Sequence, residues 1–196
     1  MIIGRKSELE TLRGLIKEEY SEFVAVYGRR RVGKTFLVRE AFDYSFVFQH
    51  TGIANKPKAV QLEAFRRSLK EAGDTDCPHF DNWFDAFDAL KTLINSSRKK
   101  KKVLFIDEIS WMDTPKGDFL ACFEQFWNGW ASARKDIVLI ICASATSWII
   151  DKVLKNRGGL HNRVTRKMHI RPFTLKECEE YLMQRKFKIS RKSIIT

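Results

Sequence analysis

Eight residues near the N-terminus have the types and the spacing needed to hold a phosphate group. Residues 28–35 read Gly-Arg-Arg-Arg-Val-Gly-Lys-Thr and fit the pattern G-x-x-x-x-G-K-[ST] of a phosphate-binding P-loop. Gly28 and Gly33 let the backbone curl so that its N–H groups point at an anion, and the following helix adds the positive end of its dipole. Lys34 would reach the β- and γ-phosphates, and Thr35 would hold Mg²⁺ by its hydroxyl. The pattern predicts binding of ATP with Mg²⁺.

The residues on either side of the loop support that prediction. The apolar run at 23–27 has strand composition, and residues 36–42 have the spacing of a helix. A strand, a loop and a helix in this order are the setting that the motif requires. The alternative, a glycine-rich turn that happens to precede a helix, leaves both flanks unexplained. The other residues expected to touch the nucleotide here are Arg29, Arg30, Arg31, Val32 and Phe36.

A pair of acids follows an apolar run about 70 residues after the P-loop. Residues 103–106 read Val-Leu-Phe-Ile and lead directly into Asp107 and Glu108. Ligands of open parallel sheets bind at the carboxyl ends of strands. Asp107 would therefore hold Mg²⁺ through water, and Glu108 would polarise the attacking water. Many strands end in solvated acids, but this pair combined with a P-loop predicts nucleotide hydrolysis.

A cluster of hydroxyl side chains follows the next buried run, residues 137–142. Ser144 is the closest of them to the end of that run, and we expect it to contact the γ-phosphate or the attacking water. The alternative is helix capping, for which Thr146 and Ser147 are suited.

Arg163 is the last candidate, just before the final expected strand. An arginine at this point would reach the γ-phosphate of its own subunit or of a neighbouring one. The alternative is an ordinary surface arginine in a basic region. The sequence leaves both interpretations open.

The elements that must position these groups alternate between strand and helix. That alternation predicts a parallel sheet with helices on both faces, the three-layer α/β/α sandwich of P-loop proteins. We expect strands at 23–27, 45–49, 103–106, 137–142 and 165–170, and helices at 6–20, 36–42, 58–71, 81–96, 118–133, 148–154 and 174–183.

Length and composition fit one α/β domain, or one domain and part of another. The chain has 196 residues, of which 44% are hydrophobic, and no apolar run approaches the ~18 residues of a membrane span. The N-terminus lacks the apolar region of a signal peptide. The four cysteines are far apart in the sequence, which predicts a reducing cytoplasm and neither a disulfide framework nor a cysteine metal site.

The net charge of +12 is concentrated near the C-terminus. Residues 1–150 carry +3 and residues 151–196 carry +9. Such asymmetry indicates nucleic acid or an acidic protein partner, or else a solvated face or one that packs on a missing domain. The basic turn at 98–102 is a second candidate for nucleic acid, although a solvated loop is favoured because a buried strand follows it.

Taken together, these motifs resemble the AAA+ superfamily of ATPases over almost the whole chain. Residues 2–5, Ile-Ile-Gly-Arg, are similar to the apolar-Gly-Arg segment that this superfamily places against adenine, which implies a nucleotide contact for Gly4 and Arg5. The order of motifs matches as well, ending in Pro-Phe-Thr-Leu at 172–175, which opens a helical lid. Residues 27–35, 106–111 and 158–163 resemble more narrowly the prokaryotic archaeal-type ATPases near the STAND signalling NTPases.

The resemblance implies an ATP-binding core at 1–172 and the beginning of a helical lid at 173–196, apparently truncated. Members of that family usually continue into a winged helix and often a nuclease-like domain, so we expect a longer protein. Relatives often have Gly-Ser where this chain has Ala143-Ser144. The missing part of the lid would hold the usual second sensor of bound nucleotide.

Three functions are compatible with these residues. The first is an ATPase whose turnover drives or resets a nucleic-acid or defence function. The second is a nucleotide-loaded switch that turns over slowly. The third is a small-molecule kinase, against which Glu108 argues, because an acid that activates water promotes wasteful hydrolysis.

Overall fold

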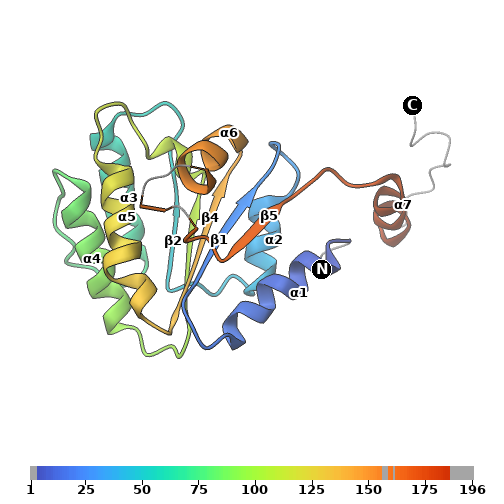
Figure 1. Ribbon diagram of the computed structural model, residues 1–196, viewed down its shortest axis with the longest axis horizontal. Coiled ribbons are helices and arrows are strands. Elements are labelled where there is room, and N and C mark those ends of the chain that lie inside the picture. Colours follow the sequence, from blue (N-terminus) through green and yellow to red (C-terminus); the bar gives the residue numbers. More distant parts are fainter. Residues whose placement is uncertain (1–3, 156–158, 161, 186–196) are drawn as a thin grey trace.

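The computed structural model describes residues 4–155, 159–160 and 162–185. Its centre is a parallel sheet of five strands in the order β2-β3-β4-β1-β5 (Figure 1). The strands are β1 (Glu22–Tyr27), β2 (Phe48–Thr51), β3 (Lys102–Asp107), β4 (Ile137–Ala143) and β5 (Arg166–His169). Parallel neighbours need crossover connections, so helices run back over both faces and form the predicted three layers.

Helices α3, α4 and α5 cover one face of the sheet, and α1 and α2 cover the other (Figure 1). Within the described residues, no helix is long and apolar enough to cross a membrane. The helices are α1 (Lys6–Gly14), α2 (Lys34–Ala41), α3 (Lys58–Glu71), α4 (Trp83–Ser96), α5 (Phe119–Gly129), α6 (Thr146–Trp148) and α7 (Leu175–Gln184). Shorter 3₁₀ segments are η1 (Leu15–Lys17), η2 (Ile109–Trp111) and η3 (Ala131–Ala133), and η4 (Ile149–Leu154) is π-helical.

The core is divided in two by the sheet, because successive residues of a strand point to opposite faces. In β1, Phe23 and Ala25 pack with the α3, α4 and α5 side, whereas Val24 and Val26 pack with the α1 and α2 side. Both faces are covered, so the central strands read as unbroken apolar runs rather than as alternating ones. That arrangement leaves the carboxyl ends of the strands as the place where polar side chains emerge.

Several expected elements differ from the structure. The helix expected at 118–133 ends at Gly129, and most of the one expected at 148–154 is the π-helical η4. The helix expected at 6–20 ends earlier, since Gly14 is a poor helix former and Glu18 is already extended on the way to β1. The strand expected at 45–49 begins only at Phe48. Asp43 and Tyr44 both have positive φ, so the chain is still turning there, and ladder pairing with β3 begins afterwards.

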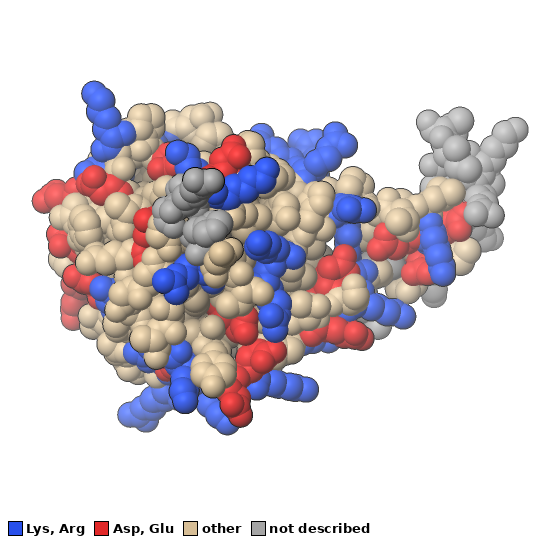
Figure 2. Space-filling model, in the orientation of Figure 1, with Lys and Arg blue, Asp and Glu red and all other residues tan. Residues whose placement is uncertain are grey.

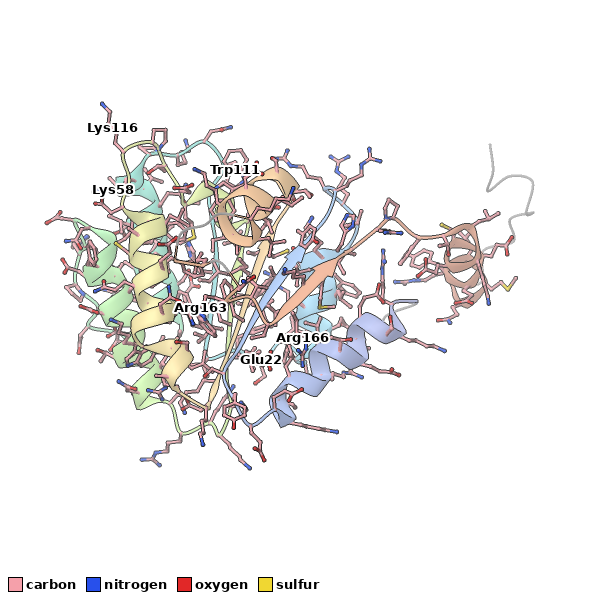
Figure 3. All side chains as sticks on the ribbon, in the orientation of Figure 1. Glu22, Lys58, Trp111, Lys116, Arg163 and Arg166 are labelled. Atoms are coloured by element: carbon pink, nitrogen blue, oxygen red, sulfur yellow. The ribbon has the colours of Figure 1, made fainter. Side chains whose placement is uncertain are left out.

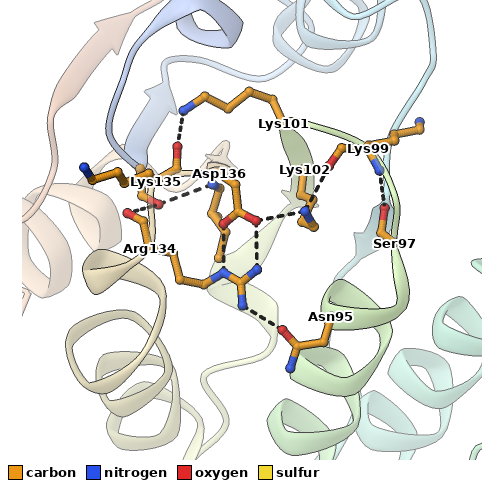
Figure 4. Close-up of polar contacts among 10 residues, drawn as sticks. Asn95, Ser97, Lys99, Lys101, Lys102, Arg134, Lys135 and Asp136 are labelled. Carbon is orange, nitrogen blue, oxygen red and sulfur yellow. Dashed lines mark hydrogen bonds and ion pairs between the residues drawn. The ribbon is translucent and has the colours of Figure 1, made fainter.

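The basic turn before β3 joins a polar network at the amino end of the sheet (Figure 4). Lys102 Nζ donates to Asp136 Oδ2 at 2.8 Å, and the Arg134 guanidinium donates to both oxygens of the same carboxylate at 2.8 Å. These two cations, Arg134 first, hold the pKa of Asp136 well below its usual range. Lys101 Nζ donates to the Tyr20 carbonyl oxygen at 2.8 Å. The turn is a loop, as expected, but part of its charge closes the end of the sheet rather than facing water.

Candidate functional site

The P-loop has the backbone conformation that its two glycines predict. Gly28 has φ +147°, and a Cβ there would lie 2.2 Å from the Ile170 carbonyl oxygen at the end of β5, so no side chain fits. Gly33 has φ +88° and is the residue before α2. A side chain at Gly33 would meet nothing within 4 Å, so there it is the left-handed conformation that requires glycine.

Lys34 is turned back onto its own loop. Its side chain is 5% exposed, and Nζ donates to the carbonyl oxygens of Gly28 and Arg29, both at 2.9 Å. A third hydrogen bond runs to Ser144 Oγ at 3.1 Å. The ammonium group therefore lies where the loop curls, with its donors directed at protein oxygens.

Thr35 and Asp107 meet at the carboxyl end of β3. Thr35 Oγ1 donates to Asp107 Oδ2 at 2.7 Å, and the Glu108 N–H donates to Oδ1 at 2.9 Å. A hydroxyl and a carboxylate are hard oxygen donors, and Mg²⁺ uses one or two such protein groups together with phosphates and water. The pair therefore fits the metal that the sequence predicts. Burial first, and then the Asp107 carboxylate, raise the pKa of the Cys142 thiol, which stays neutral beside the site.

Glu108 has a positive φ of 47° and is held by the segment that follows β4. Ser144 Oγ donates to Glu108 Oε1 at 2.5 Å, and the Ser144 N–H donates to Oε2 at 3.4 Å. Since Ser144 Oγ also accepts from Lys34, the three side chains form one hydrogen-bonded chain. Helix capping does not explain Ser144, which lies outside α6 and bonds to Glu108 instead.

A cavity of about 480 Å³ opens beside the end of the P-loop, between the start of α2 and helix α7. Arg5 crosses it: the guanidinium lies 4.7 Å from the Phe173 ring centroid and donates to the Arg171 carbonyl oxygen. A Cβ on Gly4 would lie 3.3 Å from Glu177 Oε1 of α7, so the N-terminal segment is packed against that helix. The cavity is lined by Arg5, Arg31, Val32, Gly33, Phe36, Leu37, Pro172, Phe173, Tyr181 and Arg185.

The structure thus brings most of the candidate residues to one place. Lys34, Thr35, Asp107, Glu108 and Ser144 form the polar end. The neighbouring cavity holds Arg5, Arg31, Val32, Gly33 and Phe36, with Gly4 beside it. Arg29 and Arg30 are exposed on the loop and do not line the cavity.

Arg163 is not part of this group. It is exposed, and two residues later the Thr165 N–H donates to the Phe23 carbonyl oxygen at the start of β1. The P-loop begins five residues further along β1, which is about 16 Å at the rise of a strand. Figure 3 shows Arg163 in the middle of the molecule, nearer to Glu22 than to the loop. The position does not favour contact with the γ-phosphate of its own subunit.

Two residues that the sequence reasoning missed connect the site to its surroundings. Gln61 of α3 is fully buried, and its amide bonds the N–H and carbonyl of Ile53 (3.0 and 2.6 Å) and the carbonyl of Trp111 (3.0 Å). A Cβ on Gly52 would lie 2.5 Å from the Glu108 carbonyl oxygen. The sequence does hold a signal for Gln61, because a glutamine on the apolar face of an amphipathic helix is unusual. Nothing in the residues around Gly52 indicates its contact with Glu108.

The comparison with known families decides the identity of the domain. An ATPase domain predominantly from Archaea matches residues 2–192. The chain belongs to this family. The archaeal-type ATPase family is part of the AAA+ P-loop ATPases, in agreement with the strand order and the P-loop geometry, and the resemblance found in the sequence is confirmed.

The curated relatives of this archaeal-type ATPase domain are themselves uncharacterised. An uncharacterised protein of Methanocaldococcus jannaschii, MJECL04, is 25% identical over 181 residues. The match covers 92% of this chain but only 38% of that protein, so the chain spans well under half the length of that relative. An uncharacterised ATP-binding protein of the same organism, MJ0423, is 45% identical over 40 residues, which are 20% of this chain and 68% of that one.

Solved structures show the same fold at low identity. The Walker-type ATPase PABY2304 of Pyrococcus abyssi has a TM-score of 0.70 at 14% identity, covering 98% of this chain and 61% of that one. Cdc6p of Pyrobaculum aerophilum has a TM-score of 0.62 at 18% identity, covering 93% and 49%. The Drosophila ORC, solved bound to DNA, has a TM-score of 0.62 at 16% identity, covering 97% and 52%. These likenesses confirm the predicted fold class.

Proposed function

We propose that this ATPase domain binds ATP in the P-loop together with Mg²⁺ and hydrolyses it to ADP and phosphate. The observation that carries the proposal is the meeting of Thr35 with Asp107, at 2.7 Å, beside the chain from Lys34 through Ser144 to Glu108. Phosphoryl transfer to water requires two side chains that can hold a metal ion, a cation for the phosphates and a carboxylate for the water. All of them lie at this edge of the sheet.

Each side chain has a proposed role. Thr35 and Asp107 would hold Mg²⁺, which neutralises charge on the phosphates when bound. Lys34 would bind the β- and γ-phosphates through its ammonium group. Glu108 would take the proton of the attacking water, and Ser144 would hold that carboxylate in place. The adenine would occupy the 480 Å³ cavity, between Arg5 and the residues of the lid.

One observation favours a second candidate, the slow nucleotide switch. Both carboxylate oxygens of Glu108 accept hydrogen bonds from Ser144. Each oxygen keeps a further lone pair for a proton, but the two bonds fix the direction in which the carboxylate faces, and it would have to turn to reach a water elsewhere. Turnover would then be slow until a partner changes the position of Ser144. We favour hydrolysis over the kinase alternative, since Asp107 and Glu108 in their proposed roles would promote wasteful hydrolysis in a kinase.

The partner and the wider assembly belong to this proposal as well. Residues 173–196 would be the first part of a lid over the nucleotide, and Arg163 would reach the nucleotide of a neighbouring subunit. The nucleotide state would be read by nucleic acid or by a protein partner at the basic C-terminal part. In Figure 2, Lys and Arg side chains are spread over the visible face of the molecule, with acidic side chains between them. The cytoplasmic location stays a prediction.

Calorimetry with ATP and Mg²⁺ tests the binding step. Lys34→Ala removes charge-assisted hydrogen bonds to phosphate worth about 1.5–3 kcal/mol each, so its affinity should fall at least tenfold. Lys70→Ala, which removes an exposed lysine at the far end of α3, is the matched control and should bind as the wild type does. Equal affinity in all three proteins would contradict the P-loop assignment.

Phosphate release tests the chemical step. Glu108→Gln should keep ATP affinity and lose hydrolysis, because an amide cannot accept the proton of water. Measurable ATP binding with almost no turnover in the wild type itself would decide for the switch. Hydrolysis by Glu108→Gln at the wild-type rate would exclude Glu108 as the base.

A further inference from the structure

A second cavity lies at the carboxyl edge of the sheet, on the side of β2 and β3. Its volume is about 790 Å³, and it shares no lining residue with the nucleotide cavity. Its walls are two loops, residues 55–58 before and into α3, and residues 110–116 around and after η2. Nothing in the proposed chemistry of ATP uses it.

Three lysines line this cavity. Lys56 and Lys116 are exposed and Lys58 is half-buried, and none of the three forms an ion pair with a carboxylate in the described part of the chain. The single acid of the lining, Asp113, already accepts a hydrogen bond from Trp148 Nε1 at 2.8 Å. The lining therefore carries three positive charges against the single negative charge of Asp113, an excess that suits a ligand with several negative groups.

An aromatic side chain completes the lining. Trp111 stands in the second wall, and its carbonyl oxygen is fixed by the buried Gln61 amide at 3.0 Å. In Figure 3, Lys58 and Lys116 lie near each other at one corner of the molecule, and Trp111 lies further along the same edge, toward α6. Cations for a backbone and an aromatic ring for stacking are the combination with which proteins bind single strands of nucleic acid.

We propose that this cavity binds single-stranded nucleic acid. The lysines Lys56, Lys58 and Lys116 contact successive phosphates, and the Trp111 ring stacks on one base. A single strand is specified because a base can reach a ring inside a cavity only when it is not already stacked and paired in a duplex. Stacking is tolerant of sequence, so binding is sequence-indifferent.

The binding does not depend on hydrolysis of ATP, although the two sites are neighbours. One wall begins directly after Glu108, and the other follows Gly52, which packs on the Glu108 backbone. Because the lysines and Trp111 lie outside the nucleotide site, failure of either proposal leaves the other standing, and each is measured separately.

Fluorescence anisotropy of a labelled oligothymidine of about 12 nucleotides, with the full chain, tests the proposal. The triple variant Lys56→Gln, Lys58→Gln, Lys116→Gln should bind much more weakly, and the slope of log affinity against log salt should fall by about 0.7 for each lost phosphate contact. The matched control changes Lys17, Lys70 and Lys100 to Gln, which removes the same charge elsewhere. It should keep most of the affinity and the slope.

Trp111→Leu separates stacking from charge. It should weaken binding about tenfold while leaving the salt slope unchanged, because no phosphate contact is lost. The ATP affinity and melting temperature of each variant are measured in parallel, so that a misfolded protein is recognised. A cavity variant that binds the oligonucleotide as the wild type does, while folded, overturns the proposal.

Three other ligands and variants sharpen the result. A duplex of the same length should bind more weakly than the single strand at equal salt, and tighter binding of the duplex overturns the proposal. Polyglutamate of matched charge should compete poorly, and competition as strong as that of the oligonucleotide would point to an acidic protein instead. Loss of binding in Lys152→Gln, Lys155→Gln, but not in the cavity variant, would move the site to the basic C-terminal part.

Discussion

Ser144 is hydrogen-bonded to two side chains with proposed roles in ATP hydrolysis. It accepts from Lys34 and donates to Glu108, so a single hydroxyl transmits the position of the cation to the carboxylate. Several serines and threonines follow β4, and residue type does not separate Ser144 from the others. The two hydrogen bonds do. The importance of Ser144 comes from the place where the strand ends.

Replacing Ser144 with alanine should change turnover more than binding. Ser144→Ala leaves the P-loop intact, so ATP affinity should stay within about threefold. Glu108 loses the hydroxyl donor and keeps only the longer bond from the backbone N–H of residue 144. If the hydroxyl positions the base, phosphate release should slow; if it restrains the base, as in the switch, release should accelerate. Ser147→Ala is the control. An unchanged rate would show that the bridge has no part in turnover.

At this scale the sequence predicts a good deal. The residues Gly28 to Thr35 and the acids Asp107 and Glu108 follow from pattern, because the chemistry permits few alternatives at each position. The placement of Arg163 could not be predicted. Where it points depends on where β5 begins to pair with β1, and pairing register is set by contacts distant in the sequence.

His50 illustrates what burial in a strand costs a titratable group. It lies on β2, 3% exposed, between the rings of Phe48 and Phe65, and its Nδ1 is 2.9 Å from Ser68 Oγ. Burial lowers its pKa from 6.5 to about 4. Between these two pH values, His50 is therefore neutral in the folded protein and protonated in the unfolded chain.

Stability should fall on acidification because of this residue. Above pH 6.5 His50 is neutral in both states; between about pH 6.5 and 4 only the unfolded chain is protonated, so the free energy of unfolding decreases, by up to about 3 kcal/mol. His50→Leu cannot be protonated and should lose less stability over that interval. Urea unfolding of both proteins at pH 7 and pH 4.5 measures the difference. Identical losses would exclude His50 as the cause.

Gln61 supports the candidate site from helix α3. The Gln61 amide is hydrogen-bonded to backbone groups of Ile53 and Trp111. Gln61→Leu leaves these groups without a partner, which should lower the free energy of unfolding by about 1–3 kcal/mol. Because Trp111 belongs to the segment after Glu108, kcat should fall more than the ATP affinity does. Gln125→Leu, on the exposed side of α5, is the control. A loss confined to stability, with kcat unchanged, would make Gln61 purely structural.

Helix α3 was predicted at its observed bounds, whereas β2 was misplaced by three residues. The difference has a physical reason. An amphipathic helix carries its periodicity within itself, over four turns of sequence. A four-residue strand is defined by its partner, and the residues before Phe48 meet the sheet only at its margin. The Val47 N–H donates a single hydrogen bond to the Val103 carbonyl oxygen at 2.9 Å, and Phe46 packs against Phe105.

The polar side chains at the two ends of the sheet have different roles in the molecule. Polar side chains at the amino end, around Asp136, close the structure with ion pairs. Those at the carboxyl end are arranged around the P-loop and the acids that follow β3. Arg163 stands two residues before Thr165, which bonds to the start of β1 rather than to its P-loop end, so its proposed role requires a second subunit.

Mixing two variants tests that role. Arg163→Ala and Glu108→Gln should each hydrolyse ATP poorly, but a mixture should recover activity, because some interfaces then join an intact Glu108 to an intact Arg163. Turnover of the wild type should also rise with protein concentration. Arg166→Ala, which breaks the nearby pair with Glu18, is the control. A mixture no more active than its components, at concentrations where subunits associate, would exclude action between subunits.

The position of Lys34 has a consequence for which anions the protein can select. In the structure the ammonium group already has three oxygen partners, from Gly28, Arg29 and Ser144. An incoming ion has to replace them, and chloride offers a single acceptor centre while a triphosphate offers many oxygens in a row. We therefore expect small anions, which are abundant in any cell, to compete poorly for the loop. Its selectivity should follow the number of acceptor atoms that a ligand offers, and not its charge alone.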